Sequence, residues 1–314
     1  AREGKGRVTF PDGGTYAGAF KADRREGEGT LTLPDGLRYT GQWQAGQING
    51  TGKLEHPNGD VYEGSFVQGK REGEGRMIYA KGGTYEGGFK ADQRHGQGSF
   101  VGADKAHYRG AWVAGRMEGQ GQLTYPDGST YQGGFKADLP DGKGKISYPS
   151  GASYDGQWAA GVMTGTGTLR NADGSSYTGA VVAGKPEGRG EMTYADGYRY
   201  DGSWKAGLRD GVGKASWADG TVYEGAFKAD KREGKGKLTQ PDGFSYEGDW
   251  AAGEMQGQGL AVYPSGDRYE GAFVKGKRQG PGKLTYKNGE TSEGVWENGI
   301  LKAPLPAAAA PTAP

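Results

Sequence analysis

The chain has 314 residues, a net charge of +1, an apolar content of 33%, 65 glycines and no cysteine. An average globular domain, with glycine counted, has roughly 45–50% apolar residues, so we expect no deep hydrophobic core. The near-zero charge argues against a nucleic acid held mainly through phosphate contacts. The lack of cysteine excludes disulfides and zinc–thiolate sites, and no apolar run is long enough for a transmembrane helix.

A pattern of 23 residues recurs through the chain without insertion or deletion. A tyrosine opens each copy, and we number it position 0. It stands at Tyr16, Tyr39, Tyr62, Tyr85, Tyr108, Tyr131, Tyr154, Tyr177, Tyr200, Tyr223, Tyr246 and Tyr269, with Ser292 in its place in the last copy. A fixed period in this range predicts a repeat array rather than separate globular domains.

We therefore divide the chain into an array at residues 1–302 and a tail at residues 303–314. The array comprises a half-repeat and about thirteen full units. Proline and alanine dominate the tail, and this composition favours polyproline-like or disordered chain. The chain begins at Ala1, without methionine and half a repeat late, which is consistent with a removed or omitted leader.

Each repeat contains two segments with the period-two pattern of β-strands. Positions 0–4 read Tyr-x-Gly-x-aromatic, and positions 11–17 read Gly-x-Gly-x-Leu-x-Tyr. We expect a six-residue loop between them and a turn of the Pro34-Asp35-Gly36 type between repeats. The pattern thus predicts an all-β fold, an elongated, twisted, single-layer antiparallel meander of tandem hairpins with about 26 strands.

Most aromatic residues fall in three columns of the repeat. Positions 0, 4 and 17 hold 32 of the 35 aromatic residues. The period-two pattern places these columns on one face, with the glycines of positions 2, 11 and 13 among them. Because glycine has no side chain, we expect neighbouring rings to lie in the hollows that it leaves.

The pattern resembles the MORN (membrane occupation and recognition nexus) repeat over essentially residues 4–302. Residues 39–52 show the match, Tyr-x-Gly-x-Trp-x-x-Gly-x-x-x-Gly-x-Gly. The resemblance implies a twisted β-ribbon with a concave aromatic groove, and roles in scaffolding, self-association, protein docking and membrane or phosphoinositide contact. Two departures are evident. Val181 replaces the ring at position 4, and aspartate replaces the position-7 glycine at Asp23, Asp92, Asp138 and Asp230.

The aromatic stripe has two interpretations. Its rings either pack against one another along the ribbon, or part of the stripe stays open as a groove for a partner strand, helix or peptide. We predict that Val181 leaves a notch where the ribbon bends or admits a partner side chain. The candidate groove residues are Trp112, Tyr131, Trp158, Tyr177, Val181, Trp204 and Trp217.

Clusters of basic residues suggest a second kind of surface. The candidates for contact with anionic lipid are Lys70, Arg71, Lys231, Arg232, Lys275, Lys277 and Arg278. Summed over the repeats, positions 5–10 are net positive and the Pro-Asp-Gly turns are net negative. The alternatives are simple solvation of these loops and lateral pairing of ribbons, the basic edge of one against the acidic edge of another.

The sequence offers no pairing of a nucleophile with a base and no metal site. Three histidines, His56, His95 and His107, have no further ligands at metal-binding spacing. Asp127 and Asp196 precede turn glycines, as structural turn residues do. The glycine pairs lack the strand–loop–helix context of a phosphate loop. We therefore expect no enzyme activity, no cofactor and no metal.

The sequence thus predicts a non-catalytic scaffold that binds protein partners or copies of itself along an aromatic groove. The alternatives are a peripheral module that binds phospholipid and a platform on which tyrosine and tryptophan rings stack against a glycan. No nucleic-acid partner is expected. A location peripheral to a membrane or cell envelope is favoured over the free cytoplasm.

Overall fold

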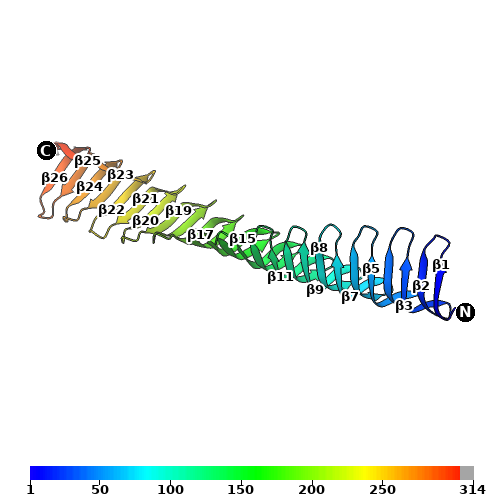
Figure 1. The fold of residues 1–314 in the computed structure, drawn as a ribbon. Coiled ribbons are helices and arrows are strands. Elements are labelled where there is room, and N and C mark those ends of the chain that lie inside the picture. The colour runs from blue at the N-terminus through cyan, green and yellow to red at the C-terminus, as the bar shows by residue number, and fades with distance from the viewer. Residues whose placement is uncertain (305–314) are drawn as a thin grey trace, which may run out of the picture. The chain divides into compact units, whose positions relative to one another are not determined.

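The computed structural model describes residues 1–304, and this range contains 27 β-strands and no helix. The strands form an open antiparallel sheet in which β1 to β14 pair in chain order, as β2 does with β3 and β3 with β4, and so do β15 to β27 (Figure 1). The all-β, single-layer meander is therefore confirmed. The tail predicted at residues 303–314 lies, from residue 305 on, outside the described residues.

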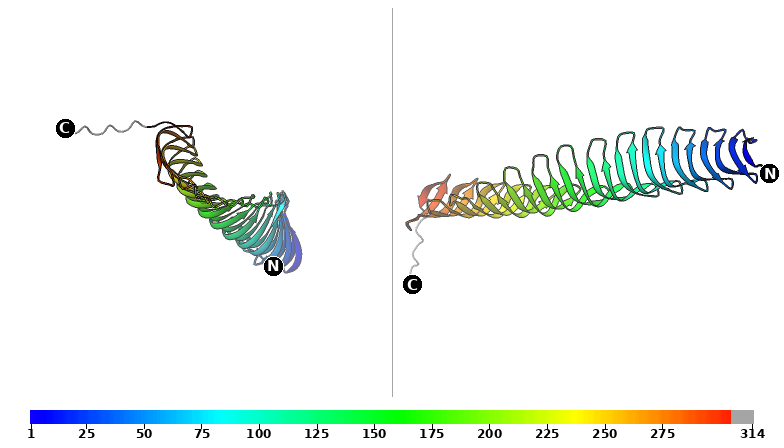
Figure 2. Two further views of the ribbon diagram at one scale, coloured as in Figure 1. Left: turned by 90° about the vertical axis from the view of Figure 1, so that its left-hand side faces the viewer. Right: turned by 60° about the horizontal axis from the view of Figure 1, so that its bottom comes forward.

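The chain divides into two compact units, residues 1–162 and 163–314. Within each unit, consecutive strands lie side by side in all three views (Figures 1 and 2). The strands of the first unit are β1 Gly4–Thr9, β2 Thr15–Lys21, β3 Arg24–Thr32, β4 Arg38–Gln44, β5 Gln47–Glu55, β6 Val61–Val67, β7 Lys70–Ile78, β8 Gly83–Lys90, β9 Gln93–Gly102, β10 His107–Val113, β11 Arg116–Thr124, β12 Thr130–Lys136, β13 Leu139–Ser147 and β14 Ser153–Ala159.

The second unit begins within β15, and its last strand, β27, runs two residues into the predicted tail. Its strands are β15 Val162–Arg170, β16 Ser176–Val182, β17 Lys185–Thr193, β18 Arg199–Lys205, β19 Leu208–Ser216, β20 Val222–Lys228, β21 Lys231–Thr239, β22 Ser245–Ala251, β23 Glu254–Val262, β24 Arg268–Val274, β25 Lys277–Thr285, β26 Thr291–Glu297 and β27 Ile300–Pro304.

The loop inside each hairpin is shorter than the sequence predicted. Only two residues, such as Ala22 and Asp23, separate the strands, so the expected six-residue loop is wrong. Both residues have positive φ, 48° and 64°, which is the geometry of a type I′ turn. This turn explains the aspartates that replace glycine at position 7, because aspartate tolerates the left-handed region better than most residues.

The turn between repeats follows the prediction. In the example Pro34-Asp35-Gly36, the amide of Gly36 donates to the carbonyl of Leu33 at 3.0 Å, and Gly36 has a φ of 95°. The carboxylate of Asp35 accepts a hydrogen bond from the amide of Leu37 at 3.0 Å. Proline, aspartate and glycine thus each meet a geometric need of the turn.

A β-bulge recurs in the hairpins and explains the glycine at position 11. Opposite the single residue Ala19 on β2, strand β3 has three residues between its paired positions Arg25 and Gly29. The central one, Gly27, has a φ of 66°. The glycines of position 11 therefore allow the backbone conformation of the bulge. The sequence interpretation, in which they leave a hollow for a ring, is wrong for this column.

The glycines of positions 2 and 13 do leave the expected hollow. They pair across the hairpin, as Gly18 does with Gly29, and the ring of Tyr16 lies over both. A Cβ atom on Gly18 would lie 2.5 Å from the hydroxyl oxygen of Tyr16, a distance no real contact allows. All twelve tyrosines of position 0 are at most 1% exposed, so this single-layer sheet has a narrow core made of one tyrosine per repeat.

Candidate partner-binding surfaces

The rings of positions 0 and 4 form a closely packed zipper on the inner face, which we define as the face that bears the tyrosines. Tyr16 packs edge-to-face against Phe20 of its own repeat and Trp43 of the next, with centroid distances of 5.1 and 5.3 Å. The same alternation runs to Trp158 in the first unit and from Tyr177 to Trp296 in the second. Edge-to-face pairs add about 0.5–1.5 kcal/mol each beyond area burial, so the zipper is a main source of stability.

Polar atoms of the zipper are also satisfied within the sheet. Each position-0 hydroxyl donates to the carbonyl three residues on, at the bulge, as Tyr16 does to Ala19 at 3.1 Å. Each tryptophan of position 4 donates its Nε1 proton to a position-13 carbonyl of the preceding repeat, as Trp204 does to Gly190 at 3.0 Å. The zipper therefore presents neither free ring faces nor free polar atoms.

The seven groove residues predicted from the sequence lie on this inner face, but six of them are buried. Trp112, Tyr131, Trp158, Tyr177, Val181 and Trp204 are at most 7% exposed, whereas Trp217 is half-buried. Of the two interpretations of the stripe, the structure shows self-packing for positions 0 and 4. These six side chains are the floor of the inner face, and Trp217, at position 17, lies at its rim.

Val181 interrupts the series of ring contacts without disturbing its hairpin. The register of β16 and β17 keeps the usual bulge, with Val181 opposite Pro186. Its side chain is fully buried, so the structure shows no open notch at this position. The missing ring leaves Tyr177 with a ring partner in the next repeat, Trp204, and none at position 4 of its own.

Arginine at position 9 covers part of the zipper. The guanidinium carbon of Arg25 lies 4.1 Å from the ring centroid of Trp43 and 5.8 Å from that of Tyr16. Its Nη2 atom donates to the carbonyl of Gly46 at 2.9 Å. This cation–π contact joins consecutive repeats, and the sequence interpretation had placed such arginines in basic loops instead.

The seven lipid-contact candidates fall into two structural classes. Lys70, Lys231, Lys275 and Lys277 are exposed near the hairpin turns. The others, Arg71, Arg232 and Arg278, hold position 9, and each guanidinium carbon lies 5.6 Å from the ring of its own repeat's tyrosine. Each also donates to a backbone carbonyl of the next repeat at 2.7 Å. Three of the seven candidate side chains thus already contact rings and backbone carbonyls of the sheet.

The rings of position 17 form a separate row, which we call the rim row. It lies where the inner face meets the turns between repeats. Its members are Phe10, Tyr79, Tyr125, Tyr148, Tyr194, Trp217, Tyr263 and Tyr286. Seven of them are half-buried, and Tyr286 is 38% exposed. Gly102, Asn171 and Gln240 interrupt the row, so its later members stand in neighbouring pairs.

A hollow opens between two rim rings of the first unit. Tyr125 and Tyr148 flank it, and its lining also includes Pro126, Asp127, Ser129 and Ile146, around a volume of about 360 Å³. Burial raises the pKa of both tyrosine hydroxyls. Both therefore remain protonated hydrogen-bond donors at neutral pH.

A second rim pair is enlarged by a ring that the repeat pattern did not single out. Tyr198, from the turn after β17, lies 5.2 Å from Tyr194 and 5.1 Å from Trp217, centroid to centroid. Arg209 stacks over Tyr198 at 5.6 Å and donates to Asp230 at 3.0 Å. The sequence could have indicated this extra ring, because Tyr198 is one of only three aromatic residues outside positions 0, 4 and 17.

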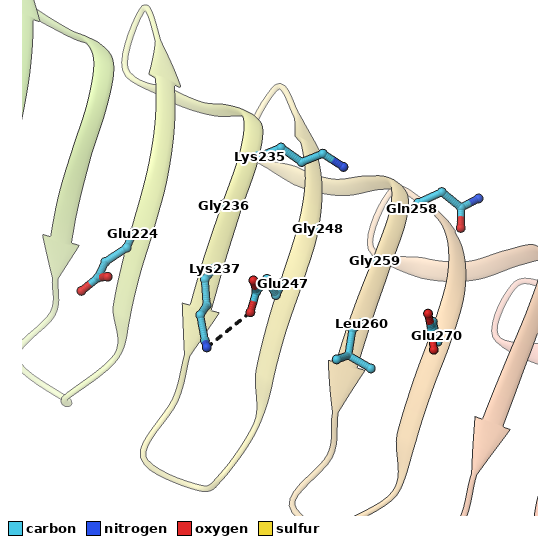
Figure 3. A pocket seen from close by; sticks show the side chains of 10 residues that line it. All are labelled: Glu224, Lys235, Gly236, Lys237, Glu247, Gly248, Gln258, Gly259, Leu260 and Glu270. Carbon is cyan, nitrogen blue, oxygen red and sulfur yellow. Dashed lines mark ion pairs between the residues drawn. The ribbon is translucent and has the colours of Figure 1, made fainter.

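The opposite, outer face has a polar ladder that the sequence interpretation missed. Positions 1 and 14 are cross-strand neighbours, and they pair Lys237 with Glu247 at 3.3 Å (Figure 3). In the same way they pair Lys214 with Glu224 at 2.6 Å. A shallow hollow of about 590 Å³ lies along this ladder, lined mainly by its charged side chains and by glycines. These side chains are exposed, so each pair contributes about 0–1 kcal/mol.

The chemical candidates behave as structural residues. Asp127 and Asp196 accept hydrogen bonds from the amides two residues on, Ser129 and Tyr198, at 2.8 and 2.9 Å, as turn aspartates do. Among residues 1–304, no three histidine, cysteine or carboxylate side chains come close enough to hold a metal ion. The same range includes no helix with the length and apolar character that crossing a membrane requires.

The geometry defines a tandem β-hairpin repeat protein, with a sealed aromatic zipper, an aromatic rim and a polar outer face. The family model of the MORN repeat matches thirteen consecutive segments, which together cover most of residues 1–291. The chain therefore belongs to the MORN repeat family. No curated protein matches the sequence.

Solved structures with some likeness to this chain include two TCP domains. The TCP10 domain of Danio rerio CPAP, in complex with a peptide of STIL, shows 16% identity and a TM-score of 0.26, covering 93% of this chain and 99% of that one. The TCP domain of Drosophila melanogaster SAS-4, in complex with a proline-rich motif of Ana2, shows 16% identity and a TM-score of 0.28, covering 64% and 90%. TM-scores this low tell nothing about the partners of this chain.

Proposed function

We propose that this protein is a non-catalytic repeat scaffold that binds protein partners, or other copies of itself, along the aromatic side of its sheet. The observation that carries the proposal is the rim row, in which half-buried rings recur at the edge of a face that no second layer within residues 1–304 covers. Aromatic side chains offer large contact areas at a low entropic cost, and rows of them on a surface favour an interface.

The buried zipper gives the proposed interface a rigid floor. Trp112, Tyr131, Trp158, Tyr177, Val181 and Trp204 hold the strands in register, while the rim rings above them offer contact area. A partner would thus meet a preorganised surface, which lowers the entropic cost of binding. Trp217, the seventh residue predicted for the groove, lies in the rim row and not in the zipper.

The structure gives less support to the lipid and glycan alternatives. Arg71, Arg232 and Arg278 are engaged with rings and carbonyls, so a head group would have to compete for them. The four lysines stay exposed, but at a net charge of +1 their attraction to an anionic surface is weak. Glycan platforms need free ring faces with polar groups beside them, and the zipper rings have no free face.

Comparative affinity capture from native lysate tests the proposal. The chain is compared with a rim variant, Tyr125→Ala with Tyr148→Ala, and with a control on the outer face of the neighbouring strands β12 and β13, Gln132→Ala with Lys145→Ala. We expect the rim variant, and not the control, to lose specific protein partners. An identical set of proteins captured by all three forms would contradict the proposal.

A further inference from the structure

The spacing of the rim row matches a particular kind of chain. Each repeat contributes two strands, so neighbouring rim rings such as Tyr125 and Tyr148 stand about 9.6 Å apart along the sheet. A polyproline II helix has three residues per turn and rises about 3.1 Å per residue, which gives about 9.3 Å per turn. Every third residue of such a helix, laid along the rim, therefore meets a ring of the next repeat.

The hollow between Tyr125 and Tyr148 has the chemistry that a polyproline helix requires. Two aromatic rings flank it, Pro126 and Ile146 give it an apolar part, and Asp127 and Ser129 complete the lining. Aromatic-lined slots of this type accept proline rings because the ligand is already extended and loses little entropy on binding. The carbonyls of a polyproline helix have no internal partners, and the protonated tyrosine hydroxyls can donate to them.

The chain itself contains a segment with the matching composition and spacing. Residues 303–314 read Ala-Pro-Leu-Pro-Ala-Ala-Ala-Ala-Pro-Thr-Ala-Pro, carry no charged side chain and place Pro311 and Pro314 three residues apart. This spacing equals one polyproline turn, and so fits one pair of neighbouring rim rings. The later members of the rim row stand in such pairs, because Gly102, Asn171 and Gln240 interrupt it.

We infer that the segment of one copy that follows β27, residues 305–314, docks in polyproline II conformation on the rim row of another copy, with Pro311 and Pro314 against Tyr125 and Tyr148. The inference rests on the proposed function and names the partner of that surface. Within the second unit, eleven strand spacings, about 53 Å, separate β27 from β16. Ten polyproline residues span roughly 31 Å, so within its own copy the segment reaches only rim rings of the second unit, whereas the hollow at Tyr125 and Tyr148 belongs to the first.

Fluorescence anisotropy with a labelled peptide of residues 303–314 tests the inference directly. The protein is the chain ending at Pro304, so that no resident segment competes. We expect saturable binding that weakens about tenfold or more in the Tyr125→Ala, Tyr148→Ala variant, because two ring contacts are lost. The outer-face control, Gln132→Ala with Lys145→Ala, should bind like the parent chain.

A change in the peptide avoids any effect on folding. Inserting one alanine between Thr312 and Ala313 changes the proline spacing from three to four residues and leaves composition nearly unchanged. We expect this peptide to bind about tenfold more weakly, because its two prolines no longer match one ring pair. Equal binding of both peptides, or no binding of either, would overturn the inference. If the rim variant still loses protein partners from lysate, the proposed function survives that result, and if it loses none, both fail.

Discussion

The hydroxyl of the position-0 tyrosine is the most repeated polar contact of the fold, and Tyr62→Phe isolates it. Tyr62 is fully buried, and its hydroxyl donates to the carbonyl of Ser65 at 3.0 Å. The pairing of β6 with β7 passes over Ser65 at the bulge, so this carbonyl has no ladder partner in that hairpin. Phenylalanine keeps the ring contacts with Phe66 and Phe89, at 5.1 and 4.9 Å, and removes only the donor.

The expected loss is about 1–2 kcal/mol, within the range for leaving one buried acceptor unsatisfied. In a linear array this loss acts mainly on the mutated repeat and its neighbours, because each repeat contacts only adjacent ones. Native-state hydrogen exchange read by mass spectrometry should therefore show faster exchange in β6 and β7, with distant strands nearly unchanged.

Tyr286→Phe is the matched control. Tyr286 is 38% exposed, and its hydroxyl has one long contact, 3.5 Å, with Ser292. We expect this substitution to change local stability by less than about 0.5 kcal/mol. If Tyr62→Phe altered exchange no more than Tyr286→Phe does, the bulge carbonyl would not need its tyrosine, and our account of position 0 would be refuted.

Three further predictions follow from the repeat geometry. Gly75→Ala should destabilise the chain by roughly 2–4 kcal/mol, because its Cβ would lie 2.4 Å from the Tyr62 hydroxyl oxygen. Gly69→Ala meets no atom within 4 Å and should cost about 1 kcal/mol through its positive φ alone, and urea unfolding compares the two. Asp92→Ala should weaken the junction of two repeats by about 1 kcal/mol, because the carboxylate accepts a hydrogen bond from the Arg71 amide at 2.9 Å. Unchanged hydrogen exchange in β7 would show that this bond does not contribute to stability. Burial raises the pKa of Tyr62 to about 12. The protonated hydroxyl therefore contributes its full stability below about pH 10, and this contribution is lost as pH rises towards 12. A tyrosinate absorbance titration in which all tyrosines ionised near pH 10 with the fold intact would contradict the raised pKa.

Period and composition were enough to predict the class of fold. An exact repeat with two period-two segments and a Pro-Asp-Gly turn leaves few architectures besides a hairpin meander. The turn at Pro34-Asp35-Gly36 follows local rules that act over four residues, and the structure confirms it. The type I′ turn at Ala22 and Asp23 escaped prediction, because alanine is an unusual residue at positive φ and gives no local signal for it.

The surface was harder to predict than the fold, since the sequence pattern places residues on a face but does not say how far each is covered. Tyr131 and Tyr148 both fall on the inner face, yet Tyr131 is fully buried and Tyr148 is half-buried. The difference arises from the glycine pair that receives the ring of Tyr131, Gly133 and Gly144, and from the ring of Trp158 beside it. Tyr148 sits at the end of its strand, where no glycine pair opens beneath it. Cross-strand register, which decides these neighbours, depends on the bulge, and the sequence did not reveal the bulge.

The position of the proposed interface follows from the thinness of the sheet. A single layer has no interior, so each repeat must bury its largest rings against its own backbone and its neighbours' rings, and the zipper uses the inner face for this purpose. The outer face satisfies its charges by cross-strand pairs such as Lys237 and Glu247. The rim row combines aromatic area with incomplete cover, because it lies beyond the glycine pairs and at the turns. We therefore expect partners to bind at position 17, beyond the glycine pairs that bury the other rings. The residue at this position can differ from repeat to repeat without disturbing the fold.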